Sequence, residues 1–229
     1  MSSADSTRST AEATGARPLD RRARRRQETI DEIVRIATDV MTEHGVNALS
    51  FAEIARRLGV QPPALYKYFD SVLDLYDTLF ERGMTELVDI MRATMSEAAP
   101  GLPAVVAGLE ASGRWCLANR AIAQLLFWRP VPSFEPSAQA FAPSIELVNL
   151  QRAAIADAIA AGQLGATNID DVVNLISMLI SGAITQAMAN EPDLKWGQGR
   201  FTPLFPRLIE LIPALYPPTK KRAPRSRGD

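Results

Sequence analysis

Apolar residues recur at intervals of three and four along most of the chain, a spacing that places them on one face of an α-helix. The first such stretch runs from about Asp20 to His44, with Ile30, Ile33 and Ala37 among its apolar positions. No stretch shows the sustained alternation of apolar and polar residues that is typical of a half-buried strand. The pattern therefore predicts an all-α fold of about nine helices.

Residues with strong preferences for helix ends divide this pattern into elements. Gly45 follows the last apolar turn of the first helix, as expected at a helix C-terminus. Ser50 is expected to cap a second helix, with Glu53 completing a capping box and Gly59 ending the helix. Further helices are expected at about 62–69, 71–95, 103–118, 119–129, 137–163, 168–190 and 200–216.

The elements group into two helical domains between two polar tails. A helix-turn-helix domain is expected at 20–70, and a larger ligand-binding and dimerisation domain at 71–216. The segment 1–19 is rich in Ser, Thr and Ala without apolar periodicity, so we expect it to be disordered. We expect the same of the basic tail at 217–229.

The short helices on either side of Gly59 fit a helix-turn-helix. Two helices that cross steeply need a small residue at their contact, for which Ala55 is suitable. They also need a residue that tolerates positive φ at the turn, which Gly59 provides. Ile54, Val60 and Leu65 are expected to pack the second helix in place. The same spacing also occurs by chance in helical hairpins of unrelated function.

The third helix is too short to bury all of its large side chains. Phe69 is expected in the core, one turn after Leu65. Tyr66 and Tyr68 cannot both point inward at their spacing, so at least one is expected on the surface. Exposed polar and aromatic side chains on a short helix suit contacts with DNA bases and phosphates, whereas the alternative for each aromatic residue is core packing.

The segment from about Arg25 to Leu87 resembles the DNA-binding domain of the TetR family of bacterial transcriptional regulators. The resemblance lies in "IVRIATDVMTEHGVNALSFAEIARRLGVQPPALYKYFDSVLDLYDTLF", where "IA..LGV" and "LY.YF" follow an apolar helix that ends in Gly. It implies an all-helical homodimer that represses transcription from a pseudo-palindromic, double-stranded operator and releases it on binding a small ligand. The DNA-binding residues expected from this reading are Arg24, Arg25, Ser50, Gln61, Pro63, Ala64, Tyr66, Lys67 and Tyr68.

Two positions depart from the family pattern. Gln61 stands where the family usually has a Ser or Thr that caps the recognition helix, and Pro62 partly offsets the weaker cap. Val72 stands where a phosphate-binding lysine is usual at the start of the fourth helix. In place of that lysine, we expect the N-terminus of the fourth helix itself to contact phosphate.

Charge is unevenly distributed, although the formal net charge is only −1. Five arginines fall between Arg21 and Arg26, whereas residues 71–216 carry 9 basic and 15 acidic residues. A focused basic cluster beside an acidic body is typical of proteins with a nucleic-acid face. A solvated helix start explains the cluster equally well when charge alone is considered.

The body is expected to enclose a largely apolar cavity for an apolar or weakly polar effector. For each aromatic or polar residue of these helices, ordinary core packing is the alternative. Small residues such as Gly182 and Ala187 on the helix at 168–190 suit a close contact with a second subunit. The candidate ligand-binding residues are Trp115, Asn119, Phe127, Trp128, Phe141, Asn149, Met178, Ser181 and Thr185.

Several other classes of protein are not indicated. His44 is the single histidine and Cys116 the single cysteine, and the chain has no phosphate-binding glycine loop or HExxH motif, so we expect neither an enzyme nor a metal or cofactor site. No signal peptide or uninterrupted apolar span is found, so we expect a cytoplasmic protein without membrane contact. The remaining alternative is a helical carrier or adaptor for apolar ligands that does not bind an operator.

Overall fold

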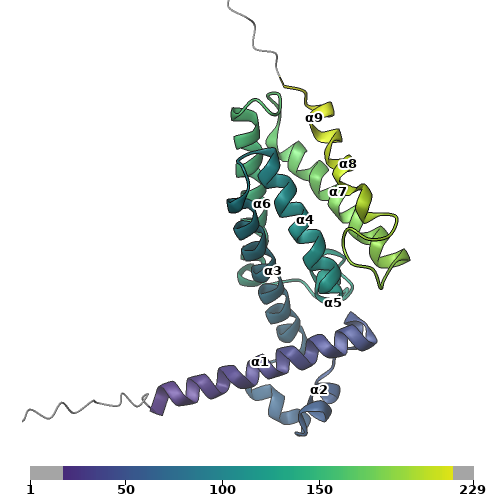
Figure 1. Ribbon diagram of the computed structural model, residues 1–229. Coiled ribbons are helices and arrows are strands. Elements are labelled where there is room, and N and C mark those ends of the chain that lie inside the picture. The colour runs from purple at the N-terminus through teal and green to yellow at the C-terminus, as the bar shows by residue number, and fades with distance from the viewer. Residues whose placement is uncertain (1–17, 219–229) are drawn as a thin grey trace, which may run out of the picture.

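A computed structural model describes residues 18–218, so most of the two tails expected at 1–19 and 217–229 lies outside this range, and α1 already begins at Pro18. Within it every regular element is helical, which confirms the all-α prediction (Figure 1). The elements are α1 (Pro18–His44), η1 (Val46–Ala48), α2 (Phe51–Leu58), η2 (Pro62–Lys67), α3 (Val72–Glu97), α4 (Leu102–Ala118), α5 (Arg120–Phe127), α6 (Ala138–Ala160), α7 (Ile169–Asn190), η3 (Thr202–Leu204), α8 (Phe205–Ile209) and α9 (Leu211–Leu215).

The N-terminal unit lies at one end of the molecule. Figure 1 shows α1 running across the end of α3, with α2 on the side of α1 that faces away from the body. The buried face of α1 carries Ile33, Ala37 and Val40, which have no exposed surface, as the apolar periodicity predicts. Gly45 ends α1 with a φ of 88°, a conformation that residues with a Cβ rarely adopt.

The third helix differs from the prediction in type and length. It is a 3₁₀-helix that ends at Lys67 and not at Phe69. Its backbone bonds span three residues, as in the bond from Ala64 N to Gln61 O at 2.9 Å. Pro62 and Pro63 cannot donate backbone hydrogen bonds, and Gln61 makes no side-chain cap. So short an element, with few donors, is stable in the tighter 3₁₀ form.

Helix α3 connects the two domains. It begins next to the expected boundary at residue 70 and continues through the body to Glu97. Its N-terminal half contacts α1, while most of its length packs against α4, α5 and α6. At Gly83 a Cβ would lie 2.4 Å from Ile122 Cγ2, so this glycine permits the close approach of α3 and α5.

The C-terminal helix expected at 200–216 is broken into η3, α8 and α9. Prolines at 203, 206 and 213 explain the breaks, because each removes a backbone donor and clashes with the preceding turn. These short elements follow α7 along the edge of the body (Figure 1). Phe205 and Ile212 attach them to the core and have no exposed surface.

Helix α7 carries an unusually apolar sequence. It is long and apolar enough to cross a membrane by length and composition, with a mean hydropathy of 1.6 over its most apolar window. In the structure it packs against α4, α6 and α8 as a helix of the body. Only 39% of that window is buried by residues 18–218, however, and Met178 on α7 is 66% exposed.

Candidate DNA-binding and ligand-binding sites

Helix α2 is fixed at both ends as the sequence predicts. The Ser50 hydroxyl accepts a hydrogen bond from Glu53 N at 3.3 Å, which confirms the N-cap. Gly59 ends the helix in the left-handed conformation with a φ of 70°, and its amide donates to the carbonyl oxygen of Arg56 at 3.3 Å. This turn sets the angle at which the chain leaves α2 for η2.

The second half of the expected capping box is not formed. The Glu53 carboxylate turns toward its own helix and accepts hydrogen bonds from Arg56 and Arg57. Arg57 also reaches Glu43 at the end of α1, with 2.7 Å between its nitrogen and a carboxylate oxygen. Hydrogen bonds from both arginines lower the pKa of Glu53 from 4.5 to about 2. Arg57 therefore connects α2 to α1, and Glu43 and Glu53 neutralise much of the charge of the two arginines.

The packing of the helix-turn-helix agrees with the sequence except at one residue. Ile54, Ala55 and Leu65 are buried, with at most 1% of each exposed. Val60 was expected in this contact but is 42% exposed, so that prediction was wrong. Val60 follows the left-handed Gly59, which directs the chain outward before η2 returns to the core at Leu65.

The outer surface of η2 carries the residues expected to contact DNA. Gln61, Pro63 and Lys67 are exposed, Ala64 and Tyr68 are half-buried, and Phe69 is in the core. Tyr66 is 60% exposed, and its ring lies edge-on to the ring of Phe51 with 5.1 Å between centroids. Tyr66 and Tyr68 therefore do not both point into the core, as their spacing predicts. The contact with Phe51 orients the exposed ring of Tyr66.

The arginine cluster lies on the exposed first part of α1, beside η2. Arg26 donates a hydrogen bond to the carbonyl oxygen of Lys67 at 2.6 Å, and its guanidinium lies 5.3 Å from the centre of the Tyr68 ring. Arg24 pairs with Glu28 at 3.0 Å, and Arg25 is exposed. The sequence reading missed the role of Arg26, which joins the basic helix to the end of η2.

The start of α3 is less suited to phosphate than the sequence suggested. Ser71 caps the helix by accepting a hydrogen bond from Asp74 N at 3.1 Å. The Asp74 carboxylate accepts another from Asp70 N at 3.0 Å. Two carboxylates beside the helix start repel an anion, so the contact expected there in place of the missing lysine at Val72 has little support. Positive charge near η2 comes instead from Lys67 and the arginines of α1.

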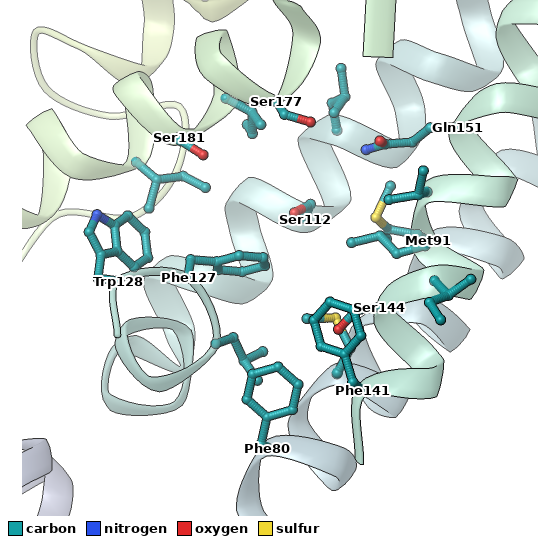
Figure 2. Close-up of a pocket in the computed structure, with 18 of the residues that line it drawn as sticks. Phe80, Met91, Ser112, Phe127, Trp128, Phe141, Ser144, Gln151, Ser177 and Ser181 are labelled. Carbon is teal, nitrogen blue, oxygen red and sulfur yellow. The ribbon is translucent and has the colours of Figure 1, made fainter. Parts of the chain in front are cut away.

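A second site lies in the body, where five helices surround a cavity of about 410 Å³ (Figure 2). Most of its wall is apolar, and partly exposed Phe127, Phe141 and Ile145 flank its opening. Arg152 is the one ionisable side chain among the lining residues, and it pairs with Asp170 at 2.6 Å. The lining residues are Phe80, Met84, Met91, Leu109, Ser112, Leu126, Phe127, Trp128, Phe141, Ser144, Ile145, Leu147, Val148, Gln151, Arg152, Ser177, Ile180, Ser181 and Ile184.

The structure brings four of the nine candidate ligand residues to this cavity: Phe127, Trp128, Phe141 and Ser181. Thr185 is exposed outside the lining and accepts a hydrogen bond from Trp128 Nε1 at 3.2 Å. The other four lie elsewhere. Met178 is 66% exposed, Asn149 accepts a bond from Arg152, Asn119 ends α4, and Trp115 is buried outside the lining.

The sequence reading missed the polar residues Ser112, Ser144 and Gln151, each at most 9% exposed and each facing the cavity. A signal was available for two of them, because Ser144 and Gln151 are seven residues apart and so share one face of a helix. Cys116 has no exposed surface, and burial raises the pKa of its thiol to about 12, so it is present as the unreactive thiol.

Comparison with known proteins places the first domain in a family. Residues 33–79 match the model of the bacterial regulatory proteins of the tetR family. The chain is 43% identical over 54 residues to the class A tetracycline repressor protein of transposon 1721 from Escherichia coli, covering 24% of this chain and 25% of the relative. It is 33% identical over 86 residues to the transcriptional activator FasR of Mycolicibacterium smegmatis, covering 38% and 39%.

These sequence matches span well under half of the curated relatives, whereas the fold is shared over nearly the whole length of known structures. The FadR regulator from Bacillus subtilis, determined in complex with stearoyl-CoA, superposes with a TM-score of 0.64 over 80% of this chain and 96% of that one, at 16% identity. The helix-turn-helix and its matched residues agree with one another: over residues 33–79 the N-terminal domain of this chain matches the TetR family of bacterial regulatory proteins, and the all-helical fold is shared with a solved TetR-family structure.

Proposed function

We propose that the protein is a ligand-released transcriptional repressor that binds a pseudo-palindromic operator as a homodimer. The observation that carries the proposal is the exposed surface of η2, where Tyr66, Lys67 and Gln61 project from an element held rigidly by α1 and α2. A short helix presented in this way fits the major groove, in which side chains reach base edges.

The basic first part of α1 adds a second contact. Arg26 holds this part of the helix against η2, so a duplex bound at η2 lies close to the arginines that precede it. Exposed arginines beside the backbone provide affinity that does not depend on sequence. We therefore assign sequence recognition to base contacts from η2, and sequence-independent affinity to phosphate contacts from α1.

The second subunit is proposed to cover the exposed face of α7 together with α8 and α9. Met178 on α7, and Leu211 and Leu215 on α9, are each at least 48% exposed. At Gly182 a Cβ would meet no atom of residues 18–218 within 4 Å, so this glycine leaves room for a neighbouring helix. A symmetric dimer places two η2 elements on one side, about 34–36 Å apart or slightly more for successive half-sites.

Release of DNA is proposed to start at the cavity and to pass through α3. Phe80 lines the cavity, and its ring lies 6.2 Å from that of Phe134 in the loop before α6. The Phe134 ring lies 5.7 Å from that of Tyr76, whose hydroxyl bonds to Val46 in the N-terminal unit. A ligand that moves Phe80 can thus tilt the N-terminal unit and change the spacing between the two η2 elements.

A gel-shift or fluorescence-anisotropy titration with DNA from upstream of the protein's own gene tests operator binding. Tyr66→Ala and Lys67→Ala should each weaken specific binding by about 1–3 kcal/mol if the side chain reads a base. A lysine that only contacts phosphate would instead weaken binding to every sequence. Val60→Ala, at an exposed position on the turn, is the matched control. Unchanged binding in both η2 variants would contradict the assignment, and a chain that binds ligand but no DNA would be a carrier.

Reciprocity tests the switch. A ligand that weakens operator binding by some factor must itself bind more weakly, by the same factor, when the operator is present. A coupling of about 1–3 kcal/mol corresponds to a factor of roughly 5–150. If a ligand binds tightly in the cavity and operator affinity does not change, the proposed switch is wrong and the body serves only in dimerisation.

A further inference from the structure

The cavity in the body is lined by two polar side chains for which residues 18–218 provide no hydrogen-bond partner. The Ser144 hydroxyl is buried without a hydrogen-bond partner among the described residues, although a hydroxyl in such a place normally has one. Gln151 is only 8% exposed and lines the same cavity, and its side-chain amide makes no hydrogen bond within residues 18–218. In Figure 2 the Gln151 amide points into the open space between the helices.

These two residues stand apart along the cavity. Both belong to α6 and are separated by seven residues, so their Cα atoms lie on one face of the helix about 10 Å apart along its axis. Phe141 stands near Ser144 in Figure 2, and Met91 lies between Ser144 and Gln151 in the same view. The wall between the two polar groups is therefore apolar.

The cavity is not equipped to hold a charge. Arg152 at its edge donates to Asp170 and to Asn149, so it is already engaged. A carboxylate moved from water into such a cavity loses its hydration without gaining a free cation in return. Hydroxyl and amide donors, in contrast, match a neutral acceptor such as a carbonyl oxygen.

We propose that the effector is an elongated neutral molecule with two hydrogen-bonding groups separated by an apolar segment, one group bound by Gln151 and the other by Ser144. This inference rests on the proposed function only in calling the molecule an effector, because the binding site stands on its own contacts. Leaving a buried hydroxyl unpaired is unfavourable, and a ligand that supplies the missing partner recovers that loss on binding.

A matched set of probes tests the spacing and the charge. The probes are undecane, a monoketone and a diketone of the same length, and undecanoate, with the diketone chosen so that its carbonyl carbons stand about 10 Å apart when extended. Binding to the full chain without DNA is followed by tryptophan fluorescence, since Trp128 lines the cavity. We expect affinity to rise about two- to tenfold from undecane to monoketone and again to diketone. Undecanoate should bind more weakly than the monoketone at neutral pH.

Two substitutions assign the groups. Gln151→Leu and Ser144→Ala should each lower the affinity for the diketone about two- to tenfold. Neither should change the affinity for undecane. Ser144→Ala should also leave the free protein equally or more stable, because it removes an unsatisfied buried hydroxyl, so any loss of ketone binding is not a folding defect. Gln139→Leu, at an exposed position on the same helix, is the matched control.

Equal affinity for undecane, monoketone and diketone would overturn the proposal. So would tighter binding of undecanoate, or a Ser144→Ala variant that binds the diketone as well as the parent chain does. Since DNA is absent from these measurements, a failure to regulate DNA binding would count against the proposed function and not against the chemistry of the cavity.

Discussion

The hydroxyl of Tyr76 donates a hydrogen bond to the carbonyl oxygen of Val46, with 2.5 Å between the two oxygens. Tyr76 belongs to α3, and Val46 begins η1 in the N-terminal unit, so the bond joins two segments 30 residues apart in the chain. Both residues are buried, with 3% and 4% of their surfaces exposed. A buried bond between the long helix of the body and the DNA-binding unit restricts how the two move relative to each other.

Tyr76→Phe should lower the free energy of unfolding by about 1–3 kcal/mol, because it leaves the buried Val46 carbonyl without its donor. Urea denaturation followed by circular dichroism measures the loss. Tyr66→Phe removes a hydroxyl from a residue that is 60% exposed and should change stability by no more than about 0.5 kcal/mol. Equal losses in the two variants would show that the Tyr76 bond contributes nothing specific.

The arginines between Arg21 and Arg26 should supply affinity that depends on salt and not on sequence. A variant that lacks residues 1–26 should bind operator and non-operator DNA more weakly, and its loss of affinity should be greatest at low salt. Replacing only Arg22 and Arg25 with Ala leaves the Arg26 bond to Lys67 intact, and it should reduce the salt slope by about one unit for each phosphate that is no longer neutralised. If the dependence of DNA affinity on salt concentration does not change, these arginines do not contact DNA and contribute only to solubility.

Gly59→Ala should destabilise the N-terminal unit. A Cβ at this position meets nothing within 4 Å, so the cost comes from the backbone φ of 70° and not from a clash. For residues other than glycine the left-handed conformation costs about 1–2 kcal/mol. Gly59→Asn should cost less, because asparagine tolerates this region better. Thermal unfolding of the three proteins gives the order directly, and an Ala variant as stable as the parent chain would contradict it.

Glu53 should make α2 sensitive to acid. Its pKa in the folded protein is about 2, against 4.5 ordinarily, so its stabilising effect is fully present above about pH 4.5 and declines as pH falls toward 2. Glu53→Gln should therefore melt at a lower temperature than the parent chain at neutral pH, and the difference should shrink between pH 4.5 and 2. Glu97→Gln, at an exposed position at the end of α3, is the control. A difference in melting temperature that is constant with pH would show that the ion pairs of Glu53 are not responsible.

Most of the helices and their ends could be predicted from the amino-acid sequence, because they depend on residues close together in the chain; the exceptions are the proline-containing segments at η2 and at η3 to α9. Gly45, Ser50, Gly59 and Ser71 act on their own turns, and each occupies the position that its local preference predicts. Local spacing also predicted that at least one of Tyr66 and Tyr68 lies outside the core, and Tyr66 is 60% exposed. The family resemblance rests on this same local segment, which explains why it could be identified before the fold was known.

Which side chains face the cavity, in contrast, depends on tertiary packing. Helices α6 and α7 are apolar around much of their circumference, so their periodicity does not distinguish the face toward the cavity from the face toward solvent. Asn149 and Gln151 are both polar and two residues apart, yet only Gln151 lines the cavity. Met178 projects outward, while Ser177 before it faces inward. Such differences arise from how α3, α4, α6 and α7 pack against one another, and this packing joins residues far apart in the chain.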